Sequence, residues 1–208
     1  MKKIKLSLVI ALLGMVSLLS AQNTSFSIKG GVNMSNFYGD ELNDKNMKVG
    51  FHAGIGADFE FAPNMAIQSG LFFSTKGAKY TYKSAELNVN ANYLQLPVHF
   101  AYKIDVMPGT RVVLHAGPYV AYGIGGKRKI DSQLTDILKP IFGEPEVNTF
   151  DKDFGYKPFD AGLGIGVGAE FGRILVDLGW DMGLTNISRI DNADLKTQNA
   201  YLSVGYKF

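Results

Sequence analysis

The stretch Phe159–Leu184 reads FDAGLGIGVGAEFGRILVDLGWDMGL, and apolar residues alternate along it with glycine or polar residues. This period of two predicts β-strands, and the break at Gly172-Arg173 predicts a tight hairpin turn. The apolar positions are Phe159, Ala161, Leu163, Ile165, Val167, Ala169 and Phe171, then Ile174, Val176, Leu178, Trp180, Met182 and Leu184. The opposite face of the first strand carries four glycines at alternate positions from Gly162 to Gly168.

The glycines indicate which face of this hairpin is the inside. Glycine lowers strand stability, so a close approach must justify four of them. A crowded barrel interior does so, because large side chains from neighbouring strands can lie over the bare backbone. The apolar face also carries Phe159, Phe171 and Trp180 at its ends, which is typical of rings at membrane interfaces. The stretch therefore predicts a transmembrane hairpin whose apolar face meets lipid.

The segment Met1–Ala21 has the pattern of a secretory signal peptide, with three lysines before an apolar run that is too short for a membrane helix. We therefore expect residues 22–208 to form the exported domain. Without the three signal lysines, the 21 Lys and Arg fall to 18 against 19 Asp and Glu. This balance gives no electrostatic basis for binding nucleic acid, and the absence of cysteine excludes disulfides.

The same alternation predicts eight strands. They are Thr24–Phe37, Met47–Phe61, Met65–Tyr82, Asn92–Ile104, Arg111–Gly123, Phe159–Phe171, Ile174–Leu184 and Gln198–Phe208. The connections after the second, fourth and sixth strands are short, and the others, including Lys83–Ala91 and Ile124–Lys157, are longer and read as loops. Outer-membrane barrels have short periplasmic turns and longer extracellular loops. We therefore expect an all-β, eight-stranded antiparallel up-and-down transmembrane barrel with both termini in the periplasm.

Several motifs add a family resemblance. The segments NYLQLP (Asn92–Pro97), Gly117-Pro118-Tyr119 and KGGVNMS (Lys29–Ser35) precede the glycine-alternating hairpin, and Phe208 ends the chain. This combination resembles the outer-membrane β-barrel family common in Bacteroidota, whose members are labelled PorT-like or porin-family proteins. The resemblance implies an eight-stranded outer-membrane barrel, but no single activity. PorT-type members are linked to a protein secretion system, a role that no residue here selects.

The last strand has apolar or aromatic residues at alternate positions: Leu202, Val204, Tyr206 and Phe208. This pattern resembles the C-terminal signal that the outer-membrane insertion machinery recognises. The alternative is a last strand that happens to end in an aromatic residue.

The predicted inward faces carry three histidines and charges of both signs. The inward charges are Lys29, Asp58, Glu60, Lys76, Lys103, Arg111, Asp160, Glu170, Asp177, Asp181 and Lys207. From the inward residues we predict a polar lumen network of Lys29, His52, Asp58, His99, Arg111, His115, Tyr119, Asp177 and Asp181. An eight-stranded barrel is just wide enough for side chains to fill it, which favours a salt-bridged plug over a selective channel. We expect the opposite charges to meet at mid-height, with His115 and Tyr119 lying across the glycines of Gly162–Gly168.

Two further features bear on the wall and its loops. Pro97 and Pro118 have no N–H and fall nearly opposite each other, which predicts a bulge or a gap in pairing. The long segment Ile124–Lys157 is the candidate contact for an extracellular partner, and residues 134–141 within it show a helical spacing.

These features favour a non-enzymatic outer-membrane barrel in contact with lipid, with surface interaction or envelope support as its work. The three histidines are interpreted as hydrogen-bonded lumen residues, so no metal, cofactor or catalytic residue is expected. A lipid-modifying enzyme would need reactive groups facing lipid, and the outward strand faces offer Ser69 but no histidine or carboxylate. The alternatives are a small solute pore and a secretion-associated accessory barrel.

Overall fold

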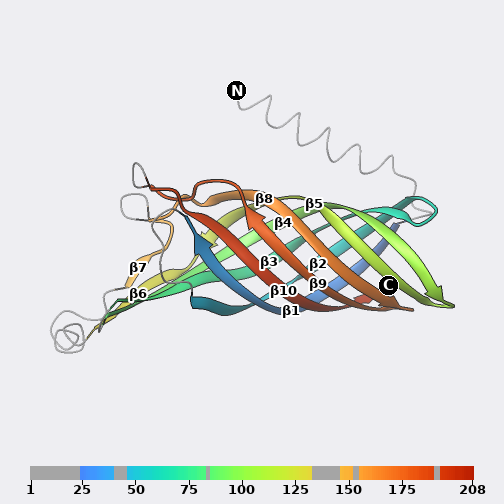
Figure 1. Cartoon of the computed structure of the whole chain (residues 1–208), viewed down its shortest axis with the longest axis horizontal. Helices are drawn as coiled ribbons and strands as arrows, with labels where there is room; N and C mark the ends of the chain where they lie inside the picture. Colours follow the sequence, from blue (N-terminus) through green and yellow to red (C-terminus); the bar gives the residue numbers. More distant parts are fainter. Residues whose placement is uncertain (1–23, 40–45, 83–84, 133–145, 152–154, 190–192) are drawn as a thin grey trace, which may run out of the picture.

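The computed structural model describes residues 24–39, 46–82, 85–132, 146–151, 155–189 and 193–208 (Figure 1). Its strands are β1 (Thr24–Tyr38), β2 (Asn46–Ala62), β3 (Met65–Tyr82), β4 (Ala85–Met107), β5 (Thr110–Gly125), β6 (Lys127–Ser132), β7 (Glu146–Asn148), β8 (Phe159–Phe171), β9 (Ile174–Gly183) and β10 (Lys196–Lys207). No helix within the described residues is long and apolar enough to cross a membrane. The predicted signal peptide and the helical spacing at 134–141 lie outside the described residues.

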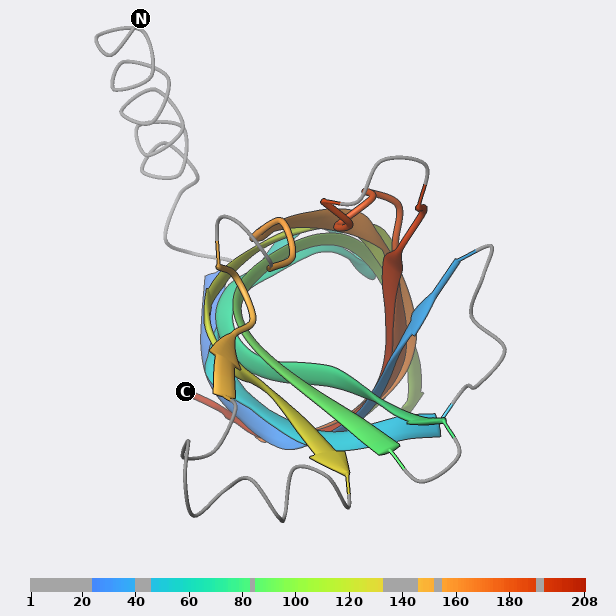
Figure 2. The same ribbon diagram turned by 90° about the vertical axis from the view of Figure 1, so that its left-hand side faces the viewer.

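Eight strands close into an antiparallel barrel, which confirms the predicted fold. Neighbours pair in the order β1-β2-β3-β4-β5-β8-β9-β10, and β10 pairs back with β1 (Figure 2). Strand β6 instead pairs with the first residues of β4, and β7 pairs with β6. A closed wall leaves no strand edge without a partner, as hydrocarbon surroundings require.

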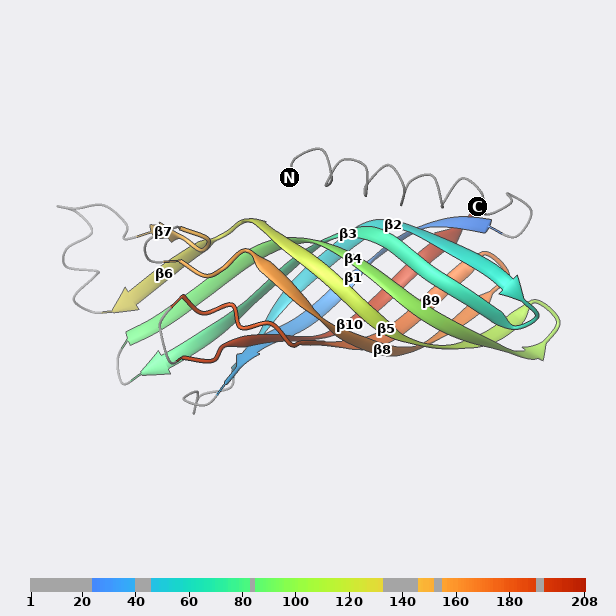
Figure 3. The ribbon, with the colours of Figure 1, turned by 90° about the horizontal axis from the view of Figure 1, so that it is seen from above.

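The two ends of the barrel differ in their connections. At one end, called the turn end below, two-residue turns join β2 to β3, β4 to β5 and β8 to β9. Asn64, Gly109 and Gly172 in these turns have φ values of 65°, 77° and 59°, a region that asparagine and glycine tolerate best. Strand β1 begins and β10 ends at the turn end, and the longer connections lie at the opposite, loop end (Figure 3).

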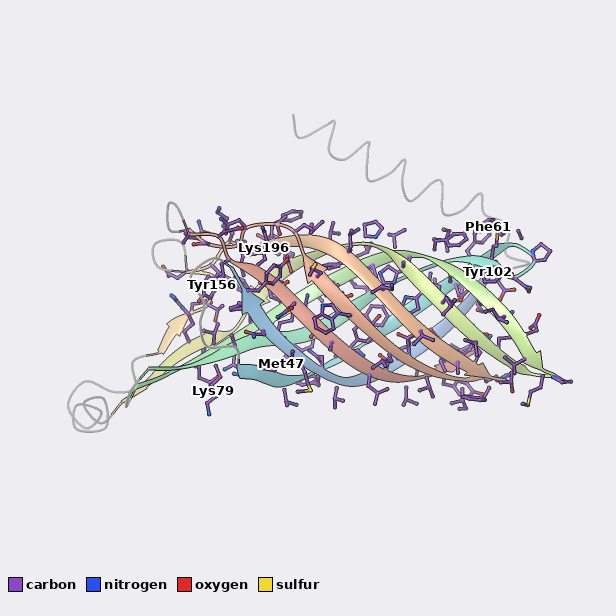
Figure 4. The ribbon with its side chains drawn as sticks, viewed as in Figure 1. Met47, Phe61, Lys79, Tyr102, Tyr156 and Lys196 are labelled. Carbon is purple, nitrogen blue, oxygen red and sulfur yellow. The ribbon has the colours of Figure 1, made fainter. Side chains whose placement is uncertain are left out.

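The outer surface of the wall is apolar, as the alternation predicts. Leu163, Ile165 and Phe171 of β8 are 54%, 65% and 50% exposed. Figure 4 shows side chains pointing away from the wall along its length, with Phe61 and Tyr102 near the turn end. A continuous apolar surface around a closed barrel is stable in lipid and not in water.

The structure corrects two predicted loops. The segment Lys83–Ala91 is not a loop, because β4 already begins at Ala85 and pairs with the end of β3. The segment Ile124–Lys157 is not a single loop either, since it contains the end of β5 together with β6 and β7. Beyond the apolar band a strand no longer separates a lipid face from a lumen face, so its sequence loses the alternation that reveals strands.

Pro97 and Pro118 interrupt the pairing of β4 with β5, as predicted. Between Pro97 and Phe100, two positions opposite Gly117 and Pro118 have no ladder pair, and the register is the same on both sides. The irregularity is therefore a gap and not a bulge. On the other side of β4, the Ser69 hydroxyl donates a hydrogen bond to the Pro97 carbonyl at 2.8 Å.

Candidate functional site

The lumen is organised in three levels along β5. Arg111, His115 and Tyr119 follow one another at intervals of four residues on its inward face. Four residues of strand span about 13 Å, so the three side chains mark successive levels from the turn end toward the loop end.

Six charged side chains fill the first level and are called the turn-end network below. They are Lys103, Arg111 and Lys207 with Asp58, Glu60 and Glu170. The fully buried Lys103 ammonium lies 2.7–3.0 Å from all three carboxylates. Arg111 reaches Glu60 at 3.0 Å and Glu170 at 2.7 Å. Lys207 also reaches Glu170, at 2.7 Å. Three cations thus face three anions, and pairing of this kind offsets the cost of desolvating them.

His115 lies at the second level. Its Nε2 is 3.0 Å from Asp177 Oδ2, and its Nδ1 is 2.9 Å from Nδ1 of His99. The two imidazoles are stacked, with ring centroids 5.1 Å apart and planes 15° apart. A Cβ on Gly166 would come within 2.4 Å of the His115 ring, so a glycine is needed where this side chain crosses β8.

His52 has its own partners at this level. Its Nε2 lies 2.5 Å from the Ser203 hydroxyl, and its Nδ1 lies 3.4 Å from the Asn33 amide oxygen. The Asn33 amide nitrogen donates to the Thr75 carbonyl at 2.7 Å, which holds its oxygen toward His52. The imidazole proton is therefore on Nδ1, and Ser203 donates to Nε2. Among the described residues, no three His, Asp or Glu side chains gather as a metal ion would need.

Asp160 and Lys76 lie at the third level, and both are fully buried. Asp160 accepts hydrogen bonds from the hydroxyls of Tyr119 at 3.3 Å and Thr197 at 2.7 Å. The Lys76 ammonium is 3.8 Å from Asp160 and lies over the rings of Tyr119 and Tyr93, 4.8 and 5.4 Å from their centroids. Cation–π contacts therefore add to the ion pair with Asp160 in stabilising the buried Lys76 charge.

Aromatic and aliphatic side chains fill the loop end and are called the loop-end cover below. They are Phe37, Tyr93, Tyr119, Phe150, Tyr156 and Ile187. The Phe150 ring packs edge-on against Tyr93 at 5.3 Å and lies so close over Gly123 that a Cβ there would be 2.2 Å from it. Tyr156 packs edge-on against Phe37 at 5.6 Å.

The chain after β7 is tied to the barrel by its backbone. The Thr149 N–H donates to the Gly126 carbonyl at 3.0 Å, and the Lys157 N–H donates to the Ile187 carbonyl at 2.8 Å. Tyr156, between these two anchors and outside the strands, lies beside the Arg128 guanidinium. Burial raises the pKa of the Tyr156 hydroxyl, and Arg128 opposes this shift.

A cavity of about 80 Å³, called the chamber below, lies between the turn-end network and the loop-end cover. A smaller cavity of about 40 Å³ adjoins it toward the turn end, and Lys29, Gln68 and Asp177 line both. Most of the residues that line this space are polar, and it is large enough for several water molecules.

The predicted lumen residues divide among these features. Asp58 and Arg111 belong to the turn-end network, Tyr119 belongs to the loop-end cover, and Lys29, His52, His99, His115, Asp177 and Asp181 line the chamber. The expectation that opposite charges meet at mid-height is wrong for the largest ion cluster, which lies at the turn end. Glu60 and Arg111 keep side-chain exposures of 36% and 25% there, which lowers their desolvation cost.

The expected crossing of Tyr119 over the β8 glycines is also wrong. The atoms nearest to a Cβ on Gly162 belong to the backbone of β9, and His99 lies over Gly164 instead. The predicted network also omits Lys103 and Glu170, although the alternation places both inward. Phe150 and Tyr156 of the cover are missed too, because their irregular segment carries no periodic signal.

The predicted insertion residues lie on the outside of β10 and just beyond it. Leu202, Val204, Tyr206 and Phe208 are 47%, 57%, 38% and 67% exposed. The rings of Tyr206 and Phe208 meet at 5.7 Å, and the Phe208 N–H donates to the Phe26 carbonyl at 2.9 Å.

An apolar outer surface, a closed wall and a polar interior define a transmembrane β-barrel. The chain belongs to the outer membrane protein beta-barrel domain family, whose model matches residues 20–189. No curated protein sequence matches it.

Solved structures that resemble the chain include three bacterial proteins. Ail, the attachment invasion locus protein of Yersinia pestis, is 18% identical over 90% of this chain and 100% of its own, with a TM-score of 0.48. Neisserial surface protein A is 12% identical over 90% and 100%, with a TM-score of 0.48. OprG from Pseudomonas aeruginosa is 14% identical over 91% and 98%, with a TM-score of 0.41. At these identities and TM-scores the likenesses say nothing of what this chain binds.

Proposed function

We propose that this protein is a non-enzymatic outer-membrane barrel whose lumen is closed and whose loop end is a surface for interaction or envelope support. The observation that supports the proposal is that side chains occupy both ends of the lumen, as the turn-end network and the loop-end cover. The extension of the sheet by β6 and β7 at the loop end adds support, because ordered structure beyond the wall is not needed to span the membrane. Segment 124–157 is the proposed contact for an extracellular partner.

The orientation is part of the proposal. We infer that residues 1–21 are a cleaved signal peptide and that both ends of the barrel chain, with the turn end, lie in the periplasm. Proteinase added to intact cells then cuts within 124–157 and spares the turns at Ala62–Asn64 and Gly172-Arg173. Cleavage at these turns with the long segment intact would invert the topology.

We also propose that the alternating residues Leu202, Val204, Tyr206 and Phe208 are read by the outer-membrane insertion machinery. The variant Phe208→Asp should then yield less heat-modifiable barrel on a gel and more unfolded protein in the periplasm. Phe26→Asp is the matched control, because Phe26 is also strongly exposed at the turn end but lies on β1. Equal yields from the two variants would argue against a signal specific to β10.

The proposed role is tested by shortening the loop end. Thr149 already bonds to Gly126, so an Asn-Gly turn can replace residues 127–148 and leave the barrel intact. In a strain that lacks the protein, full-length protein should restore both detergent resistance and attachment to a solid surface, and the shortened form should restore at most the first. Deletion of the protein without any change in either property would contradict the proposal.

A small solute pore is the second candidate, and the polar chamber favours it. A secretion-associated barrel of the PorT-like, Bacteroidota type is the third, and its support is the motifs NYLQLP and Gly117-Pro118-Tyr119. Unchanged secretion in the deletion strain would eliminate the third candidate.

A further inference from the structure

The wall beside the chamber is interrupted on both sides of β4. Towards β5, two positions of β4 opposite Gly117 and Pro118 have no ladder pair. Towards β3, Leu96 and Pro97 have none either, although the register is the same on both sides of them. Both prolines lack the N–H group that a ladder pair needs. Residues 96–99 are therefore joined to the neighbouring strands by fewer backbone hydrogen bonds than a regular strand would be.

Ser69 shows that the chamber reaches into this interruption. It occupies an outward position of β3, between Ile67 and Leu71, and breaks the apolar stripe that faces lipid. Ser69 nevertheless lines the chamber, as does Pro97 on the neighbouring strand, whereas Ile67 and Leu71 do not. The Ser69 hydroxyl bonds to the Pro97 carbonyl at 2.8 Å. The chamber thus extends from the lumen into the wall between β3 and β4.

The surface of the chamber favours an uncharged molecule. Although most of the lining residues are polar, carbon atoms make up most of the surface that they present to the chamber, and the rings of Phe72 and Tyr201 are among them. Polar groups of the wall bond to one another, as His115 does to Asp177. A molecule that arrives through the hydrocarbon of the membrane must also be uncharged, because an unpaired charge is very costly there.

The size of the space limits this molecule to about one ring. The chamber of about 80 Å³ adjoins the second cavity of about 40 Å³. An engineered protein cavity of about 150 Å³ binds benzene. Lys29 lines both cavities and can donate a hydrogen bond to an oxygen atom of the molecule. We propose that the chamber binds a small uncharged phenol, which enters from the membrane through the interrupted wall between β3 and β4.

This proposal rests on the proposed function, in which side chains occupy both ends of the lumen. The test is ¹⁹F nuclear magnetic resonance of 4-fluorophenol with the full chain in bilayer nanodiscs. We expect a protein-bound signal that saturates at one per chain and is absent from empty nanodiscs. Phenol should displace it, and benzoate, which has the same ring but a negative charge, should not. Magnetisation exchange between the bound and free signals gives the rate of entry and release.

Substitutions separate the route from the site. Ser69→Leu restores the apolar stripe and fills the interrupted wall, and Pro97→Ala returns an N–H to the ladder. Each should slow the exchange of 4-fluorophenol by about tenfold and change its dissociation constant much less. Ile67→Leu, at the neighbouring outward position that does not line the chamber, should exchange as the wild type does. Ser74→Phe, which places a ring in the chamber, should abolish binding. Heat-modifiability on a gel establishes that each variant is folded.

Three results would overturn the proposal. Folded wild-type protein without a bound signal would mean that the chamber holds only water, and it would leave the proposed function intact. Displacement by benzoate as effective as by phenol would mean that the ligand does not arrive through hydrocarbon. Exchange that is unchanged in Ser69→Leu and Pro97→Ala but faster in Phe150→Ala would place the entrance at the loop end. That last result would also contradict the proposed closed lumen.

Discussion

The turn end and the loop end of the lumen are occupied by different kinds of side chain. At the turn end, six charged side chains from five strands of the wall meet, with Lys103 bonded to three carboxylates. At the loop end, aromatic rings do this work, and two of them, Phe150 and Tyr156, come from the irregular segment after β7. The turn-end network consists entirely of wall residues, whereas the loop-end cover combines wall residues with two rings from a connecting segment.

The two ends should therefore contribute differently to the stability of the barrel and to the access of proteinase to the loop end. The ion pairs of the turn-end network connect five strands of the wall, and removal of one partner leaves other charges buried without compensation. Rings on a connecting segment contribute packing that can be lost while the barrel remains closed around its backbone ladder. We therefore expect substitutions at the turn end to lower the free energy of unfolding most. Substitutions at the loop end should mainly increase the access of proteinase to the segment after β7.

The largest expected effect is that of Lys103→Met. The substitution removes the ammonium group that pairs with Asp58, Glu60 and Glu170 in a partly buried level of the lumen. Breaking a buried ion pair costs about 3–5 kcal/mol. Urea unfolding from micelles, followed by tryptophan fluorescence, should show this loss. Lys207→Met is the control, because the Lys207 ammonium pairs, among the described residues, with Glu170 alone and its side chain keeps 18% exposure. Equal losses of stability in the two variants would show that Lys103 contributes no more to the turn-end network than Lys207 does.

Phe150→Ala should have a smaller effect on stability. Half-buried Phe150 loses its edge contact with Tyr93, which corresponds to about 1–3 kcal/mol, less than for a fully buried ring. The larger change should be faster proteinase cleavage after β7. Gly123→Ala should reproduce it, because the added methyl group meets the Phe150 ring. Unchanged cleavage in both variants would mean that Phe150 does not hold this segment.

Lys76→Met should destabilise the barrel less than Lys103→Met does, although Lys76 is as buried as Lys103. Its ammonium has no hydrogen-bond partner among the described residues. Asp160 keeps hydrogen bonds from three hydroxyls, those of Tyr119, Thr185 and Thr197. If urea unfolding showed a loss of stability as large as that of Lys103→Met, the distinction between the two ends would be wrong.

The sequence predicts the wall well because lipid imposes a strict rule on it. Each outward residue must be apolar, so strands such as Phe159–Phe171 can be read to the residue. The rule ends where the lipid ends, which is why the first residues of β4 and all of β6 and β7 are missed.

The lumen is predicted only in part, for a geometric reason. Alternation predicts that Lys103 and Glu170 point inward, but only the registers of two strand pairs, β4 with β5 and β5 with β8, show that they meet. The stacking of His99 on His115 could be anticipated, because the two lie on adjacent strands across one short turn. Phe150 and Tyr156 could not, since no pattern in their segment indicates that they turn into the barrel.

Single-channel recording in a planar bilayer tests the closed lumen most directly. With charges filling one end and rings filling the other, purified wild-type protein should give no stable unit conductance. The double variant with Lys103→Met and Phe150→Ala, if folded, serves as a partly opened comparison. Reproducible unit steps from the wild type, abolished by Gly166→Leu, would contradict the closed lumen and establish a pore.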